Sequence, residues 1–198
     1  MTNILVLKSS ALGEASASNQ LVDGFVAHWP SAHVTSRDLG ADPVPHLLPT
    51  ALSGLFGNRE GAAAATADLA DAATAELKAA DVLIIGAPMY NFGVTSTLKA
   101  WFDHVIRAGI TFQYTAEGPK GLLSGKRAIV IETRGGFYSE GPAKVMDAQE
   151  PHLRAMLGLM GISDVTFVRA EKLAISPEAK AASLAAAAAE LAALAPGA

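Results

Sequence analysis

Cysteine is absent from this 198-residue sequence, and its absence removes several kinds of chemistry. Without thiols the chain has no disulfide, no thiolate nucleophile and no cysteine-ligated zinc or iron–sulfur centre. The five histidines lack the paired spacing of a zinc site, so we expect no metal. Any redox chemistry must therefore use a bound cofactor.

An excess of basic charge and a long apolar run are also lacking. The net charge is −4 and the 15 Lys and Arg residues are scattered along the chain, so we expect no nucleic-acid partner. No stretch approaches the roughly 20 consecutive apolar residues of a membrane span, so we expect no membrane partner. Neither a basic leader nor a small-residue cleavage site precedes Ile4, which favours a cytoplasmic location.

What is present is enough apolar material for a full core. Hydrophobic residues make up 51% of the sequence, and its length suits one domain over residues 1–198. Short apolar runs rich in β-branched residues predict strands at residues 4–7, 82–85, 128–131 and 165–168, with a weaker run at 34–37. Apolar residues at consecutive positions are typical of a parallel sheet covered on both faces.

Helical spacing of apolar residues separates these runs. We expect helices at residues 19–29, 67–79, 95–106, 142–160 and 177–194. This alternation predicts an α/β fold, a flavodoxin-like doubly wound sheet of five parallel strands in the order 2-1-3-4-5, with its ligand site beyond the carboxyl ends of the strands.

Two connections are longer than such units usually need. Residues 40–61 form either a partly helical dimer or lid element or ordinary surface packing. Residues 108–125 form either a loop bordering the site or, again, surface packing.

Serines cluster directly after the first predicted strand. Ser9, Ser16 and Ser18 line a strand-to-helix turn, where hydroxyls and free helix amides accept a phosphate dianion. The alternative is that Ser16 or Ser18 merely caps the helix. No P-loop spacing and no G-x-G-x-x-G follows a strand, which disfavours ATP and a tightly bound dinucleotide. No G-x-S-x-G elbow supports serine hydrolysis.

Large apolar and aromatic residues follow the strand at 82–85. Met89, Tyr90 and Phe92 either pack in the core or sandwich a flat ring whose polar edge meets the Asn91 amide. After the strand at 128–131, the Gly135–Gly136 pair either ends the strand in an ordinary turn or lets backbone amides approach a flat ligand.

These segments together resemble the FMN-dependent NADH:quinone oxidoreductases known as azoreductases, of the acyl-carrier-protein-phosphodiesterase-like type within the flavodoxin superfamily. The Pro-Met-Tyr-Asn-Phe run at 88–92 is the most specific match. The other matching segments span the chain, at residues 6–10, 16–21, 37–39, 108–112 and 133–136.

The resemblance implies bound FMN in a homodimer with the site at the interface. The cofactor-binding residues would fall into three groups. The phosphate would be held by Ser9, Ser16, Ala17 and Ser18, and the ring by Met89, Tyr90, Asn91 and Phe92. The pyrimidine edge of the ring would contact Thr133, Arg134, Gly135 and Gly136. The substrate pocket would include Tyr114, Phe137 and Tyr138. Tyr114 would reach the partner's site, or else cover a surface loop.

The resemblance also implies a reaction. NADH or NADPH would reduce the FMN, and a quinone or an aromatic azo compound would then take two electrons per cycle by a ping-pong mechanism, with no obligatory catalytic side chain. Thr133 stands where the family often has Ser, and both keep the hydroxyl. Phe137 and Tyr138 are bulkier than in some relatives, so the resemblance does not fix the acceptor preference of this chain. A flavodoxin-type single-electron carrier and a flavin-free binding module are the alternatives.

Overall fold

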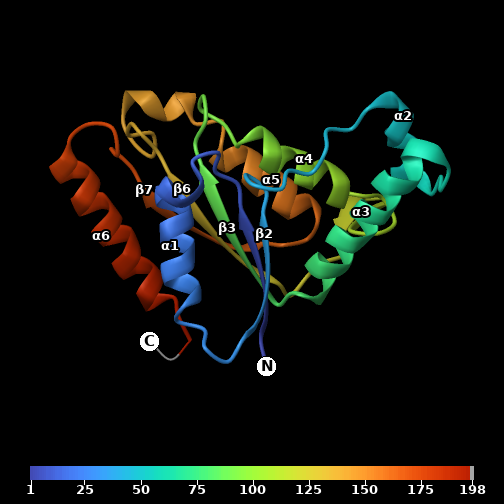
Figure 1. Ribbon diagram of the computed structural model, residues 1–198, viewed down its shortest axis with the longest axis horizontal. Helices are drawn as coiled ribbons and strands as arrows, with labels where there is room; N and C mark the ends of the chain where they lie inside the picture. The colour runs from blue at the N-terminus through green and yellow to red at the C-terminus, as the bar shows by residue number, and fades with distance from the viewer. Residues whose placement is uncertain (197–198) are drawn as a thin grey trace.

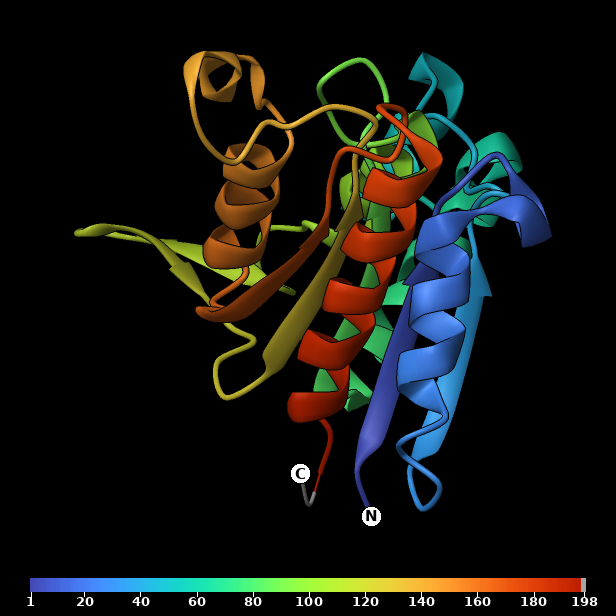
Figure 2. The ribbon, with the colours of Figure 1, turned by 90° about the vertical axis from the view of Figure 1, so that its left-hand side faces the viewer.

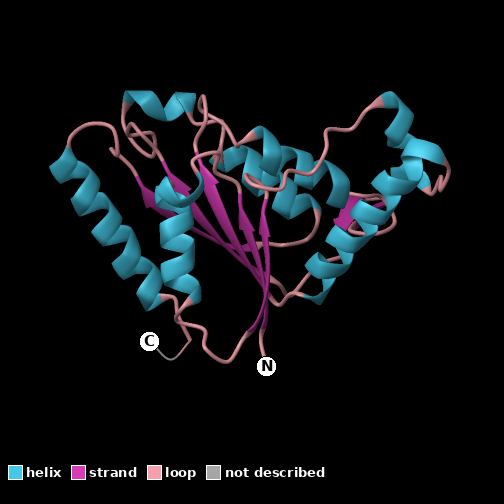
Figure 3. Cartoon of the chain, viewed as in Figure 1, coloured by secondary structure: helices cyan, strands magenta, loops and turns pink. Residues whose placement is uncertain are grey.

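The computed structural model describes residues 1–196 of the chain. A sheet of five parallel strands forms its centre, in the order β2-β1-β3-β6-β7 (Figures 1 and 3). The strands are β1 (Asn3–Lys8), β2 (His33–Asp38), β3 (Val82–Pro88), β6 (Arg127–Thr133) and β7 (Asp164–Ala170). The flavodoxin-like α/β prediction is confirmed, and each predicted strand is found. Gly197 and Ala198, the last residues of the predicted 1–198 domain, lie outside the described residues.

The predicted strand order 2-1-3-4-5 is wrong in chain numbering, because two further strands precede the fourth member of the sheet. These are β4 (Phe112–Thr115) and β5 (Gly118–Gly121), which pair as an antiparallel hairpin outside the main sheet (Figure 2). The sequence pattern did not predict these strands, because β5 is only Gly-Pro-Lys-Gly and carries no apolar pattern. Residues 108–125 are therefore a projecting hairpin as well as a loop.

Helices cover both faces of the sheet (Figure 1). Helices α1 (Ala17–Val26) and α6 (Pro177–Ala193) share one face. Helices α3 (Gly61–Ala79), α4 (Ser96–Val105) and α5 (Glu150–Leu159) share the other. Alternate residues of β1 join the two cores, with Leu5 and Leu7 on the α3 side and Ile4 and Val6 on the α1 side. Burial on both faces explains the continuous apolar runs.

The single helix predicted at 142–160 is wrong. The chain instead forms a 3₁₀-helix, η3 (Pro142–Met146), and then breaks before α5. At the break the Asp147 Oδ1 accepts the amides of Gln149 at 2.9 Å and Glu150 at 3.1 Å. An aspartate that bonds the backbone two and three residues ahead competes with the helical pattern, and Pro151 favours a new helix start there.

The long connection at 40–61 is partly helical, as predicted. It contains α2 (Pro49–Leu52) and η2 (Ser53–Phe56), which pack onto α3. Arg107 helps to hold this connection, because its guanidinium donates to Asp71 of α3 and to the Leu55 carbonyl. Within residues 1–196 no helix is both long enough and apolar enough to cross a membrane.

Candidate functional site

The three predicted segments meet at the carboxyl edge of the sheet. The Ser9 hydroxyl, after β1, donates to the Gly86 carbonyl of β3 at 2.8 Å. The Met89 amide, after β3, donates to the Thr133 carbonyl at the end of β6 at 2.9 Å. The ends of β1, β3 and β6 therefore form one continuous edge, at the point where the strand order reverses between β1 and β3.

A buried serine cluster begins α1. Ser16 is the N-cap and its Oγ accepts the Asn19 amide, while the Oγ atoms of Ser16 and Ser18 lie 2.9 Å apart. Ser16 therefore does cap the helix, and it also faces a second hydroxyl. The amides of Ala17 and Ser18 in the first turn have no intrahelical acceptor, and the positive end of the helix dipole points here. This cluster has the features of an anion site.

Ser9 is buried beside that cluster, but its hydroxyl is already used on Gly86. It joins the ends of β1 and β3 and does not offer a free donor. Of the hydroxyls that the sequence predicts for a phosphate, Ser16 and Ser18 at the start of α1 therefore remain the candidates.

The segment after β3 forms a tight turn. The amides and carbonyls of Tyr90 and Gly93 bond reciprocally at 3.0 and 3.1 Å, and the two residues between them have positive φ, 48° at Asn91 and 70° at Phe92. Positive φ at both central positions is the requirement of a type I′ turn, which Gly and Asn meet easily and Phe does not. This turn raises Asn91 and Phe92 above the sheet edge.

Tyr90 ties this turn to the serine loop. Its hydroxyl accepts the Ala11 amide at 3.1 Å and lies 3.4 Å from the Ser10 Oγ. Ser10 in turn accepts the Leu12 amide. Ser10 is a site residue that the sequence interpretation missed, and only its position between the predicted strand and the serines marks it.

A small cavity of about 260 Å³ lies above the ends of β3 and β6. It is lined by Met89, Asn91, Phe92, Gly135, Gly136 and Tyr138, all of them predicted site residues. The Phe92 and Tyr138 rings meet edge to face, 5.8 Å between centroids. A Cβ at Gly136 would lie 2.8 Å from the Tyr138 hydroxyl, so any other residue there would displace the Tyr138 ring. The cavity combines flat apolar walls with accessible backbone.

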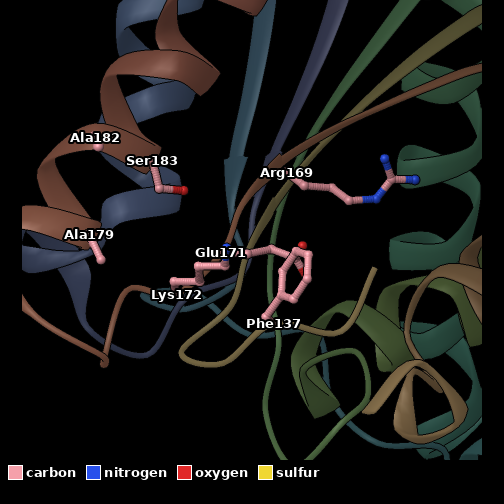
Figure 4. A pocket seen from close by; sticks show the side chains of 7 residues that line it. All are labelled: Phe137, Arg169, Glu171, Lys172, Ala179, Ala182 and Ser183. Carbon is pink, nitrogen blue, oxygen red and sulfur yellow. The ribbon is translucent and has the colours of Figure 1, made fainter. Parts of the chain in front are cut away.

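Two predicted substrate-pocket residues, Phe137 and Tyr114, lie outside this cavity. Phe137 faces a separate groove of about 500 Å³ between α6 and the end of β7, where its ring lies 4.2 Å below the Lys172 ammonium (Figure 4). Tyr114 is 76% exposed on the β4–β5 hairpin, and its ring meets the Phe112 ring edge to face. Neither side chain lines the cavity beside Met89 and Gly136.

Arg134 also turns away from that cavity. Its guanidinium is fully buried and contacts Glu132, Asp147, Gln149 and Glu171. The sequence interpretation missed these partners. One signal was present, because Glu132 places a carboxylate at the end of an otherwise apolar strand.

Burial dominates the electrostatics of Glu132. It raises the pKa of this carboxyl to about 7, although Arg134 and Arg169 favour the ionised form, and Glu150 and Asp147 add to the rise. The Glu132 Oε1 has no hydrogen-bond partner among the described residues. Burial also opposes ionisation of Glu171, but hydrogen bonds from Ser139, Tyr138 and Arg134 hold its pKa below the usual range.

Comparisons with known proteins agree with this architecture. A family model described as a flavodoxin-like fold matches residues 2–195. An FMN-dependent NADH:quinone oxidoreductase of Hyphomonas neptunium is 52% identical over 192 residues, which cover 93% of this chain and 91% of the relative.

Solved structures extend the comparison. An azoreductase of Bacillus anthracis superposes with a TM-score of 0.88 at 30% identity, covering 98% of this chain and 99% of that one. An FMN-dependent NADH-azoreductase of the same species, in complex with FMN, gives 0.86 at 26% identity, covering 98% and 100%. The chain belongs to the flavodoxin-like family that includes these FMN-dependent oxidoreductases.

Proposed function

We propose that this protein is an FMN-dependent NADH:quinone oxidoreductase that also cleaves aromatic azo compounds. The observation that carries the proposal is that a serine-lined helix start and a cavity lined by aromatic side chains and glycine backbone lie at one sheet edge, joined through Tyr90. Relatives and structural neighbours named for these activities support it. The domain is proposed to comprise residues 1–198, in a cytoplasmic protein.

The residues present fit FMN. The phosphate would be held by the first-turn amides of α1 and by Ser16, Ala17 and Ser18, a site that favours a dianion without a lysine. The ring would lie in the cavity of Met89, Asn91 and Phe92, with its pyrimidine edge toward Thr133, Gly135 and Gly136. Backbone can approach the ring closely at the glycine pair.

Bound FMN would supply hydride acceptance and two-electron transfer, which no side chain of this chain can provide. The chain itself would orient the reactants. Asn91 and Tyr138 would border the face on which a planar molecule stacks, and Tyr90 would fix the turn beneath it. Because the nicotinamide and the acceptor would both stack on the one open face of the ring, they would occupy that face in turn, which is the ping-pong order. No side chain is assigned as an obligatory acid or base.

A homodimer with the site at its interface is part of the proposal. Apolar side chains are exposed on the two long connections, with Phe56 82% and Tyr114 76% exposed. The β4–β5 hairpin, which carries Tyr114, projects from the main sheet (Figure 2), so Tyr114 would reach the cavity of a partner. NADH is proposed as the electron donor in preference to NADPH, because the relatives are named for NADH.

Anaerobic stopped-flow spectroscopy tests the proposal. Protein loaded with FMN is mixed first with NADH and then, separately, with a quinone. We expect the visible flavin band to bleach with NADH and to return with the quinone, without a long-lived radical spectrum. Failure to bind FMN would refute the proposal, and bound FMN that NADH cannot reduce would indicate a single-electron carrier.

A further inference from the structure

One buried arginine holds a network of polar side chains behind the cavity. Arg134 is 1% exposed. Its Nη2 lies 2.7 Å from the Glu132 Oε2 and 3.0 Å from the Asp147 Oδ2, and its Nη1 lies 3.3 Å from the Glu171 Oε1. Its Nε donates to the Gln149 Oε1 at 3.2 Å. The guanidinium thus meets four side chains from three separate segments.

Two of these partners hold backbone that forms the site. Gln149 Nε2 donates to the Ala87 carbonyl at 2.8 Å, two residues before the ring platform at 89–92. Glu171 Oε1 accepts the amides of Tyr138 at 2.8 Å and Ser139 at 3.1 Å, and Ser139 also donates its hydroxyl to Glu171. Removal of the guanidinium would therefore release constraints on two sides of the cavity.

The backbone of Arg134 is also fully used. Its amide donates to the Ala170 carbonyl at 2.9 Å, and its carbonyl accepts the Leu173 amide at 3.1 Å. Neither the side chain nor the main chain of this residue is therefore free for a ligand, in contrast to Gly135 and Gly136 beside it.

The requirement is for a guanidinium rather than for a positive charge alone. A guanidinium presents five donors in a rigid planar fork, whereas an ammonium is a compact point charge. Loss of a single partner from such a buried group leaves the other groups uncompensated.

We propose that Arg134 is a positioning residue, which locks the end of β3, the end of β6 and the 137–139 segment into the arrangement that receives the flavin ring, without touching the flavin. The inference rests on the proposed function for its ligand. Its structural part, the coupling of the three segments, holds for the protein with or without FMN.

The central test uses Arg134→Gln and Arg134→Lys, with Arg37→Gln as the matched control. Arg37 lies in β2, at the opposite edge of the sheet from β7, and makes a two-bond ion pair with Glu76 of α3. It does not line the cavity. Hydrogen–deuterium exchange of the FMN-free protein is followed over residues 87–93 and 135–139. FMN affinity is measured by fluorescence titration, and the environment of the bound ring by visible circular dichroism.

We expect Arg134→Gln to accelerate exchange in both segments, to weaken FMN binding by about tenfold or more, and to alter the circular dichroism of the bound flavin. Arg134→Lys should behave much like Arg134→Gln in these readouts, because lysine keeps the positive charge but lacks the planar set of guanidinium donors. Arg37→Gln should lower thermal stability and leave all three readouts unchanged.

Because Arg134→Gln could unfold the chain, Glu171→Gln provides a milder variant. It keeps one oxygen to accept an amide and should accelerate exchange only at 137–139. The inference is overturned if exchange and circular dichroism stay at wild-type values in a folded Arg134 or Glu171 variant. If wild-type protein fails to bind FMN while exchange responds as expected, the cofactor proposal fails and the positioning role of Arg134 remains.

Discussion

Glu132 shows how a residue can help to build a site and oppose stability at working pH. Its carboxyl is fully buried at the end of β6 and bonds Arg134 through one oxygen, while the other has no partner among the described residues. The energetic cost of removing the charge from water exceeds what the ion pairs with Arg134 and Arg169 return, so the pKa rises to about 7. Protonated Glu132 is then compatible with burial.

The sign of the resulting pH dependence follows directly. Between pH 4.5 and about 7 the unfolded chain loses the Glu132 proton while the folded protein keeps it. The stability from this group is full below pH 4.5 and is lost as pH rises through 7, in total about 3 kcal/mol. We expect Glu132→Gln to match wild type in free energy of unfolding at pH 4.5 and to exceed it at pH 8, measured by urea denaturation across this range.

Glu150→Gln provides a control of opposite sign in the same cluster. Burial alone would raise the pKa of Glu150, but hydrogen bonds from Arg169 and Arg154 lower it. This carboxylate stabilises the fold above its unfolded pKa, so its amide variant should be less stable than wild type at neutral pH. A Glu132→Gln variant that is also less stable than wild type at pH 8 would show that the folded-state pKa of Glu132 is not raised.

The sequence located most residues of the site but not the direction of every side chain. Hydroxyls before a helix and aromatic residues after a strand carry their chemistry in their type and place, so Ser16, Ser18 and Met89 could be found. The direction of the Arg134 guanidinium is set by its contacts with Glu171 and Gln149. These residues are distant in sequence, and no local pattern predicts such a pairing. Likewise, no local pattern predicts that the Phe137 ring packs against the Lys172 ammonium.

At the scale of elements, the turn between Tyr90 and Gly93 carries strain into the site. Phe92 has φ of 70°, a left-handed conformation that bulky residues avoid, and such strain costs on the order of 1–3 kcal/mol. The hydrogen bonds between Tyr90 and Gly93, together with the bond from the Ala148 amide to the Phe92 carbonyl, hold it in place. The turn presents the Phe92 ring to Tyr138 at the edge of the cavity.

Phe92→Gly and Phe92→Ala separate this strain from the ring. Both lose the same aromatic contact, but only glycine adopts positive φ freely. We expect the glycine variant to be more stable than the alanine variant by about 1 kcal/mol in chemical denaturation. Both should bind FMN more weakly than wild type because the ring is gone. Equal stability of the two variants would mean that Phe92 carries no strain.

Element prediction succeeded where one physical signal dominated. Consecutive apolar residues identified β1, β3, β6 and β7, and they are most continuous in β3, which is buried throughout. The edge strand β2 gave only a weaker run, because it is largely exposed. The β4–β5 hairpin gave no such signal, since it lies outside the core and β5 has glycine at both ends. The helix predicted at 142–160 breaks at Asp147, where a local side-chain bond overrides an apolar spacing that continues on both sides.

At the scale of the whole molecule, the site is assembled from distant parts of the chain. The serine cluster precedes α1, the turn follows β3, and the buried network spans β6, α5 and the end of β7. Unfolding any of these three parts separates the groups that would hold FMN. A ligand that binds only this assembled form stabilises the whole fold by mass action.

We therefore expect FMN to raise the thermal unfolding midpoint. At a free concentration 100 times its Kd, linkage adds about 2.7 kcal/mol, which is roughly 5–10 °C for a chain of this length. Differential scanning calorimetry measures it, with riboflavin at the same concentration as the matched ligand that lacks the phosphate. Because the first turn of α1 and its serines favour a dianion, riboflavin should give a clearly smaller shift. Equal shifts would show that the serine cluster does not hold the phosphate, and no shift with either ligand would contradict the proposed cofactor.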